Sequence, residues 1–244
     1  YTPMCNSNGG VVDDLLIYRL RESEFLLIVN ASRTDEDWKW IKRISKSYPN
    51  LEIVNRANSF SLLALQGPIS KHILGKHSPF PVASLGYFNF AKTELFNIPV
   101  VLSRNGYTGE DGFEIIAKSE STEQLWTLLL RAGAKPCGLG SRDILRIEMG
   151  FALYGNELSE AVTILSAIFA PRRSIIFLKI VLGPICVYQR ILFRLLNLKM
   201  VLPTTNKAVV MCERQYLYSL SLNSFLTILL KTTNFCILLK LSNS

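Results

Sequence analysis

Two adjacent aspartates, Asp13 and Asp14, interrupt a run of β-branched and aliphatic residues, Val11–Arg19, that predicts a strand. Because successive side chains of a strand point to opposite faces, the two carboxylates cannot serve the same cleft. The residues that share the face of Asp14 are Val12, Leu16 and Tyr18. One carboxylate is therefore set into an apolar face beside a tyrosine, where burying its charge is costly unless a function needs it. The local pattern alone favours the alternative, an edge strand or bulge with both aspartates in solvent.

Two glycine-rich segments are further candidates for a site. Residues 106–112 (GYTGEDG) contain three glycines and predict a shaped loop that leads into a strand. This loop lacks the Gly-Lys-Ser/Thr ending of a phosphate loop, which argues against nucleotide triphosphate binding. Residues 137–140 (CGLG) lack the third glycine of a dinucleotide fingerprint, so we interpret them as a turn. The two loops and the aspartate strand could converge on one cleft.

Metal and disulfide chemistry have little support. The five cysteines are odd in number, widely spaced and form no C-x-x-C motif: Cys5, Cys137, Cys186, Cys212 and Cys236. This pattern fits neither a zinc site nor a disulfide framework and predicts reduced thiols in an intracellular compartment. His72 and His77 have no carboxylate or cysteine nearby at ligand spacing, so both are expected to be structural or surface residues.

The elements that must position these residues alternate along the chain. Strands are expected at 11–19, 24–30, 51–56, 60–65, 86–92, 98–103 and after residue 112. Helices are expected at 35–47, 69–74, after residue 121 and at 142–149, with Thr34 and Ser141 as N-caps and Ser121 with Gln124 as a capping box. This order predicts an α+β fold of mixed and antiparallel sheets with helices on one face.

The basic charge lies in the tail. The chain has 244 residues and a net charge of +8, but residues 1–165 carry 17 basic and 18 acidic residues, against 10 and 1 in residues 166–244. We therefore predict no nucleic-acid partner for the front part. The apolar runs of the tail contain too many charges for a membrane span, although a membrane-surface helix is an alternative. Our hypothesis is that residues 163–244 are not a native continuation but the product of a frameshift or retained non-coding sequence.

Five motifs in order make the front part recognisable. They are Tyr1-Thr2-Pro3-Met4-x-Asn6-x-x-Gly9-Gly10-Val11-Val12-Asp13-Asp14, Leu65-Gln66-Gly67-Pro68, Ser103-Arg104-x-Gly106-Tyr107-Thr108-Gly109-Glu110-Asp111-Gly112-Phe113-Glu114, Gly138-Leu139-Gly140-x-Arg142-Asp143 and Leu153-Tyr154-Gly155-Asn156-Glu157-Leu158. Together they resemble the aminomethyltransferase family, the T proteins of the glycine cleavage system. The resemblance implies a partial folate-binding domain at residues 1–162, with residues 163–244 as a tail unlike the family. The start at Tyr1, with no initiator methionine or transit peptide, suggests that the true N-terminus is missing.

The resemblance also implies an activity and a site. The enzyme passes the aminomethyl group on the lipoyl arm of the H protein to tetrahydrofolate, giving methylenetetrahydrofolate and ammonia. By motif position Asp14 matches the catalytic carboxylate, Arg142 the arginine near it and Glu114 the residue that holds the pterin. The residues that match the folate-pocket lining are Tyr1, Asn30, Tyr87, Tyr107 and Arg142. The family implies the mitochondrial matrix, and we expect no membrane contact by the tail.

Two other functions stay open at this point. The first is the folate-binding domain of a flavin-linked sarcosine or dimethylglycine dehydrogenase, which resembles the T protein. Such an enzyme carries a dinucleotide fingerprint, which these residues lack but which could precede Tyr1. The second is a non-catalytic folate-binding or membrane-associated module whose tail docks on lipid.

Overall fold

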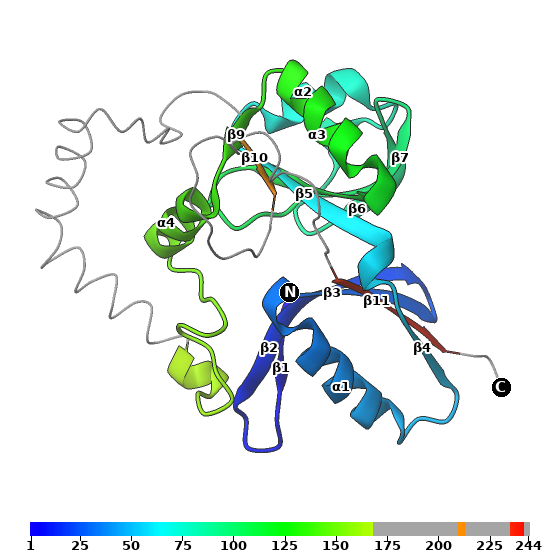
Figure 1. Cartoon of the computed structure of the whole chain (residues 1–244), viewed down its shortest axis with the longest axis vertical. Coiled ribbons are helices and arrows are strands. Elements are labelled where there is room, and N and C mark those ends of the chain that lie inside the picture. Colours follow the sequence, from blue (N-terminus) through cyan, green and yellow to red (C-terminus); the bar gives the residue numbers. More distant parts are fainter. Residues whose placement is uncertain (168–208, 213–234, 242–244) are drawn as a thin grey trace, which may run out of the picture.

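Two β-sheets face each other, and helices cover the outer face of each (Figure 1). The computed structural model describes residues 1–167, 209–212 and 235–241. Within these residues the layers follow the order helix, sheet, sheet, helix, and almost all strand pairs are antiparallel. The predicted α+β class, with helices on one face of each sheet, is confirmed.

The first sheet has five strands in the order β1-β2-β3-β11-β4. Their bounds are β1 Thr2–Cys5, β2 Val11–Arg21, β3 Glu24–Val29, β4 Leu51–Asn55 and β11 Phe235–Leu241. Helix α1 (Thr34–Ser45) crosses the outer face, where Ile41 packs on Leu15, Leu27 and Val29. The aspartate strand β2 pairs with a neighbour on each side, so it is not an edge strand.

The second sheet has six strands in the order β6-β7-β8-β5-β10-β9. Their bounds are β5 Phe60–Gln66, β6 Phe90–Leu95, β7 Ile98–Ser103, β8 Gly112–Lys118, β9 Lys135–Cys137 and β10 Val209–Cys212. Helices α2 (Ser70–His77) and α3 (Thr122–Arg131) cover its outer face. The largest hydrophobic core lies there, around Phe113, Leu125 and Leu129.

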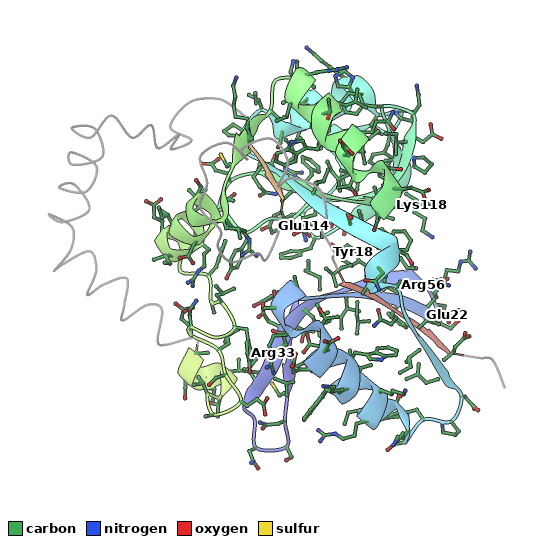
Figure 2. All side chains as sticks on the ribbon, in the orientation of Figure 1. Tyr18, Glu22, Arg33, Arg56, Glu114 and Lys118 are labelled. Carbon is green, nitrogen blue, oxygen red and sulfur yellow. The ribbon has the colours of Figure 1, made fainter. Side chains whose placement is uncertain are left out.

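The inner faces of the sheets meet in a smaller apolar layer. Tyr18 and Leu26 from the first sheet pack against Leu62 and Ile116 from the second. Figure 2 shows Tyr18 and Glu114 reaching into this space from opposite sheets. The face of β2 that carries Asp14, Leu16 and Tyr18 is therefore turned toward the second sheet.

A strap of residues 150–163 follows helix α4 (Leu139–Met149) and returns to the first sheet. The Val11 amide donates to the carbonyl oxygens of Ser159 and Val162 at 3.0 and 3.1 Å. A Cβ on Gly10 would lie 1.8 Å from the carbonyl oxygen of Glu160, so only glycine permits this close approach. The strap thus docks on the β1–β2 turn, beside the aspartates.

None of the three predicted caps, Thr34, Ser121 and Ser141, bonds the start of its helix through its side chain, although Ser121 does occupy the N-cap position of α3 (Thr122–Arg131). Short 3-10 helices at Ala31–Arg33 (η1) and Ser119–Ser121 (η4) lead directly into α1 and α3. Thr34 is the first residue of α1 and its hydroxyl donates to the Ala31 carbonyl, while Ser121 makes no side-chain cap. Because the preceding turn already supplies carbonyl oxygens, the first amides do not need a side-chain acceptor.

Other predicted boundaries shift by a few residues. Ser141 lies inside α4, whose N-cap is Gly138, and α2 extends to His77. The strand expected at 86–92 starts only at Phe90, because residues 86–89 turn sharply and Phe88 has a φ of +57°. Two further 3-10 helices, η2 (Ala57–Ser59) and η3 (Val82–Ser84), complete the elements.

Most of the tail lies outside the described residues. Its strands β10 and β11 enter the two sheets, β10 beside β5 and β9, and β11 between β3 and β4. The boundary at residue 162 and the proposed non-native origin of the tail stay predictions. Among the helices that the structure describes, none combines the length and the hydropathy that crossing a bilayer requires.

Candidate functional site

The two aspartates of β2 lie in different environments, as the alternation of a strand predicts. Asp13 is completely buried beneath α1, where Asp37 is equally buried. Asp14 is half-buried on the opposite face, which β2 turns toward the second sheet. The alternative with both carboxylates in solvent is therefore wrong, because β2 is an interior strand covered by a helix.

Hydrogen bonds hold the Asp14 carboxylate on both sides. The Tyr1 hydroxyl donates to Oδ2 at 3.0 Å, and the Asn30 amide donates to Oδ1 at 3.1 Å. The same Asn30 nitrogen donates to Asp13 Oδ1 at 2.8 Å. Asn30 therefore connects the buried aspartate with the one that faces the site.

Burial and the negative charge of Asp13 raise the pKa of Asp14, while the hydrogen bonds from Tyr1 and Asn30 oppose this shift. Loss of solvent and the adjacent Asp14 raise the pKa of Tyr1 as well, so Tyr1 remains an O–H donor. A carboxyl group with an elevated pKa beside a fixed donor is suited to proton transfer or to stabilising positive charge.

Tyr107 and Arg142 form one unit near this carboxylate. The Arg142 guanidinium lies 4.6 Å from the centre of the Tyr107 ring, a cation–π contact. The Tyr107 hydroxyl donates to the Ala152 carbonyl in the strap. Burial raises the pKa of Tyr107, the arginines Arg146 and Arg142 oppose this, and the charge of Asp14 adds to it. Tyr107 is thus within electrostatic range of Asp14.

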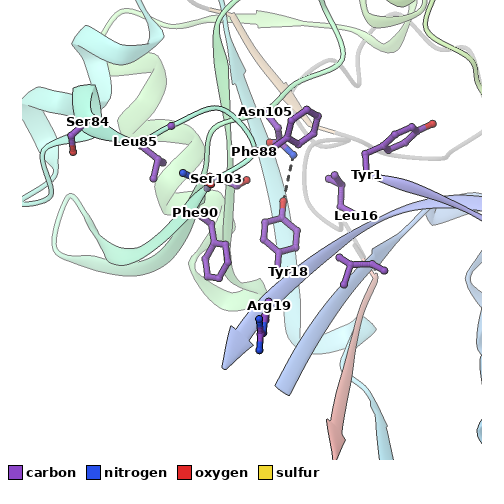
Figure 3. A pocket seen from close by; sticks show the side chains of 13 residues that line it. Tyr1, Leu16, Tyr18, Arg19, Ser84, Leu85, Phe88, Phe90, Ser103 and Asn105 are labelled. Carbon is purple, nitrogen blue, oxygen red and sulfur yellow. Dashed lines mark hydrogen bonds between the residues drawn. The ribbon is translucent and has the colours of Figure 1, made fainter. Parts of the chain in front are cut away.

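A cavity of about 470 Å³ lies between β2 and the β6–β7 hairpin (Figure 3). Its lining consists of Tyr1, Leu16, Ile17, Tyr18, Arg19, Ser84, Leu85, Gly86, Phe88, Asn89, Phe90, Ser103 and Asn105. The Asn105 amide donates to the Tyr18 hydroxyl at 3.4 Å, and Phe90 meets the Tyr18 ring edge-on. The volume and the mixture of aromatic and polar groups suit a small organic ligand. Tyr1 joins this cavity to Asp14.

Glu114 and Tyr87 lie at the borders of the cavity. Glu114 on β8 pairs in register with Ser103, a lining residue, and alternation places it on the inner face with Ile116. Tyr87 is 57% exposed and packs edge-on against Phe88, a lining residue, without lining the cavity itself. Of the predicted site residues, Tyr1, Asp14 and Asn30 are therefore in direct hydrogen-bond contact, whereas Glu114 and Tyr87 lie at the edge of the cavity.

The glycine-rich loop is shaped around one buried side chain, Gln66 at the end of β5. Its Nε2 donates to the carbonyl oxygens of Asn105 and Phe113 at 3.2 and 3.3 Å, and its Oε1 accepts from Thr108 at 3.2 Å. A Cβ on Gly106 would lie 1.8 Å from Oε1, and one on Gly112 would lie 2.3 Å from it. These glycines are needed because the loop backbone closes directly on Gln66.

Arg104 fastens this loop to the wall of the cavity. Its Nε and Nη2 donate to the two carboxylate oxygens of Asp111 at 2.9 and 3.1 Å. Its Nη1 donates to the carbonyl of Leu85, a lining residue, at 2.8 Å. A bidentate pair of this geometry fixes orientation as well as distance.

Sequence reasoning placed Tyr18 on the face of Asp14 without assigning it to the site, and it missed Asn105, Gln66 and Asp37. The position of Tyr18 on the same strand face as Asp14 was a usable signal, whereas the other three become neighbours only through tertiary packing. Among the residues that the structure describes, no three His, Cys, Asp or Glu side chains are grouped to hold a metal.

Comparisons with known proteins point to one family. The model of the GCVT N-terminal domain matches residues 1–170. The chain is similar to aminomethyltransferases of Staphylococcus epidermidis (42% identity over 164 residues, 67% of this chain and 45% of the relative) and Natranaerobius thermophilus (44% over 176 residues, 70% and 48%). The crystal structure of the glycine cleavage system aminomethyltransferase T from Bartonella henselae is 31% identical, with a TM-score of 0.55, over 66% of this chain and 43% of that one. The chain spans about half the length of the curated relatives it matches.

Proposed function

Because the chain belongs to the GCVT N-terminal domain family, we propose that it forms the folate-binding part of a glycine cleavage aminomethyltransferase. The observation that carries this proposal is the fixed carboxylate of Asp14, held by Tyr1 and Asn30 beside the cavity between the two sheets. The reaction would transfer the aminomethyl group of a lipoyl arm to tetrahydrofolate and release ammonia.

The residues around the cavity fit tetrahydrofolate. The cavity is large enough for a flat bicyclic ring, and Tyr1, Phe88 and Phe90 offer aromatic surface to it. Glu114, at the border of the cavity in register with Ser103, would accept the adjacent N–H donors of the pterin edge. Tetrahydrofolate would supply the nucleophilic nitrogen that receives the one-carbon unit.

Asp14 would act on the charge that develops during transfer. A carboxylate beside the reacting nitrogen stabilises positive charge and receives or returns a proton. Tyr1 and Asn30 would keep its two oxygens oriented, and Tyr107 with Arg142 would close the polar side of the site.

The partner and the compartment belong to the same proposal. The lipoylated H protein would deliver the aminomethyl group, and the mitochondrial matrix would be the compartment. The relatives compared above are bacterial, so fractionation of the source cells with an antibody against residues 34–45 would test the compartment.

Calorimetric titration of the whole chain with 5-formyltetrahydrofolate, a stable folate, tests the proposal. Glu114→Gln should weaken binding about 10- to 100-fold, because one charge-assisted hydrogen bond is worth about 1.5–3 kcal/mol. Asp14→Asn should leave the affinity within about threefold and lower transfer about 10²–10⁴-fold in an active full-length protein.

Asp35→Asn is the matched control, since Asp35 is an exposed aspartate in the first turn of α1. It should bind folate as the parent chain does. Absence of folate binding by the parent chain, or equal affinity of the parent and Glu114→Gln chains, would contradict the proposed function.

A further inference from the structure

A buried carboxyl pair lies behind the site. Asp13 on β2 and Asp37 on α1 are both completely buried. As two carboxylates, Asp13 Oδ2 and both Asp37 oxygens would have no hydrogen-bond partner among the described residues. Burial of two unpartnered negative charges is strongly unfavourable, whereas one proton between them joins two of the oxygens.

The charged groups around the pair agree with one proton. Arg33 from η1 is the nearby cation, and its Nη2 donates to the Val12 carbonyl at 3.3 Å and contacts Glu160 at 3.4 Å. The other titratable groups that interact electrostatically with the pair are Glu36 on α1, Tyr154 on the strap, Asp14 on β2 and Tyr1 before β1. A pair with one proton carries one negative charge, which the positive charge of Arg33 favours, while a pair without a proton carries two.

Asn30 connects the carboxyl pair, and hence its protonation state, to the Asp14 carboxylate in the site. Its amide nitrogen has two hydrogens: it donates to Asp13 Oδ1 at 2.8 Å, and on the Asp14 side it lies 3.1 Å from Oδ1 and 3.2 Å from the main-chain carbonyl oxygen. Tyr1 then donates to the second oxygen of Asp14. A continuous hydrogen-bonded chain therefore runs from Asp13, beneath α1, to the rim of the cavity.

We propose that Asp37 is a positioning residue, which shares one proton with Asp13 and thereby fixes the Asn30 amide that orients Asp14. Asp37 touches neither the cavity nor a ligand, and acts only through Asp13 and Asn30. The relevance of Asp37 to catalysis rests on the proposed function, whereas the shared proton and the position of the Asn30 amide do not depend on it.

Burial first, and then the hydrogen bond and charge of Asp13, raise the pKa of Asp37 to about 9. This supports a pair that keeps its proton at neutral pH and loses it in mild base. Loss of the proton would leave two adjacent negative charges beside the Asn30 amide, so its hydrogen bonds should change at the same pH.

The test is an NMR titration of the whole chain labelled with ¹³C-carboxyl aspartate and ¹⁵N-asparagine. We expect one aspartate carboxyl to titrate near pH 9, and the Asn30 side-chain amide and Asp14 carboxyl signals to shift at the same pH. Asp37→Asn, which is neutral and retains an N–H donor toward Asp13, should remove the step near pH 9 and leave the neutral-pH Asn30 signal in place. Asp35→Asn on the same turn should leave the step unchanged.

The outcomes separate this inference from the proposed function. Coincident steps support the inference even if 5-formyltetrahydrofolate does not bind at any pH, a result that refutes the proposed function alone. Folate binding without an aspartate titration between pH 7 and 10, or with an Asn30 signal indifferent to it, overturns the inference. The titration of the parent chain distinguishes these outcomes even if a variant does not fold.

Discussion

Replacing Gly106 with alanine should destabilise the chain through one identifiable contact. The new Cβ would lie 1.8 Å from Gln66 Oε1 and 2.6 Å from its Cδ, so the Gln66 side chain must move. Gln66 is buried and makes three hydrogen bonds, to Asn105, Phe113 and Thr108. At about 1 kcal/mol for each lost bond, the free energy of unfolding should fall by about 3 kcal/mol.

Gly75→Ala provides a control with the opposite sign. Gly75 lies exposed within α2, and a Cβ there would have no neighbour within 4 Å. The alanine should stabilise the chain by about 0.5–1 kcal/mol, because glycine in a helix has more conformational entropy to lose. Urea unfolding followed by the fluorescence of Trp38, Trp40 and Trp126 measures both variants under the same conditions.

A double-mutant cycle decides whether Gln66 is the cause. Gln66→Ala alone should cost about as much as Gly106→Ala, because it removes the same three bonds. The double variant should cost about 3 kcal/mol rather than about 6, since the alanine at position 66 leaves room for the new methyl group. Additive costs, or a Gly106→Ala variant as stable as Gly75→Ala, would refute this account of the glycine loop.

Three further perturbations have defined outcomes. Arg104→Lys should lower the free energy of unfolding in urea by about 1–2 kcal/mol, because lysine cannot form the bidentate pair with Asp111. The same change should raise the pKa of Asp111 toward its usual value, and an unchanged Asp111 titration by NMR would contradict this. Glu157→Gln should cost about 1–2 kcal/mol by thermal unfolding, since it removes one of the two carboxylates that lie 2.7 Å from Arg146, which is only 3% exposed, and leaves Asp143 in place. The folded chain keeps the Asp37 proton up to about pH 9, whereas the unfolded chain loses it near its usual value of 3.8. The free energy of unfolding should therefore fall by about 1.4 kcal/mol for each pH unit between pH 5 and 8 from this group, and Asp37→Asn should remove that slope.

Much of the architecture could be predicted from the sequence because it is encoded locally. The alternation around Asp13 and Asp14 correctly assigns the two carboxylates to opposite faces of β2. The glycine-rich segment is correctly predicted to be a loop that leads into strand β8. These features depend on the period of a strand and on the freedom of glycine, which a short window contains.

The rest depends on contacts between distant segments. Gln66 lies under the glycine loop only because β5 pairs with β8, and no local pattern marks it as a scaffold. In the sequence Asp37 is one of three acids in the first turn of a helix, yet α1 turns it toward Asp13. The side-chain caps at Thr34 and Ser121 are absent because the preceding 3-10 turns already accept the first helical amides. The assignments of Tyr1, Asp14, Asn30, Tyr87, Tyr107, Glu114 and Arg142 to the folate site all stay predictions.

The strap has a consequence for the motion of the two sheets. The chain passes from the first sheet to the second at residues 55–60, and the strap returns to the first sheet on the opposite side (Figure 1). The sheets are therefore fastened on both sides of the inner layer, and they cannot separate beside Asp14 unless the strap detaches. Detachment must break both hydrogen bonds of the Val11 amide. Hydrogen exchange at this one amide therefore reports how often the strap detaches, which sets an upper limit on how often the sheets part beside the aspartates; any ligand that needs such an opening binds no faster than that limit.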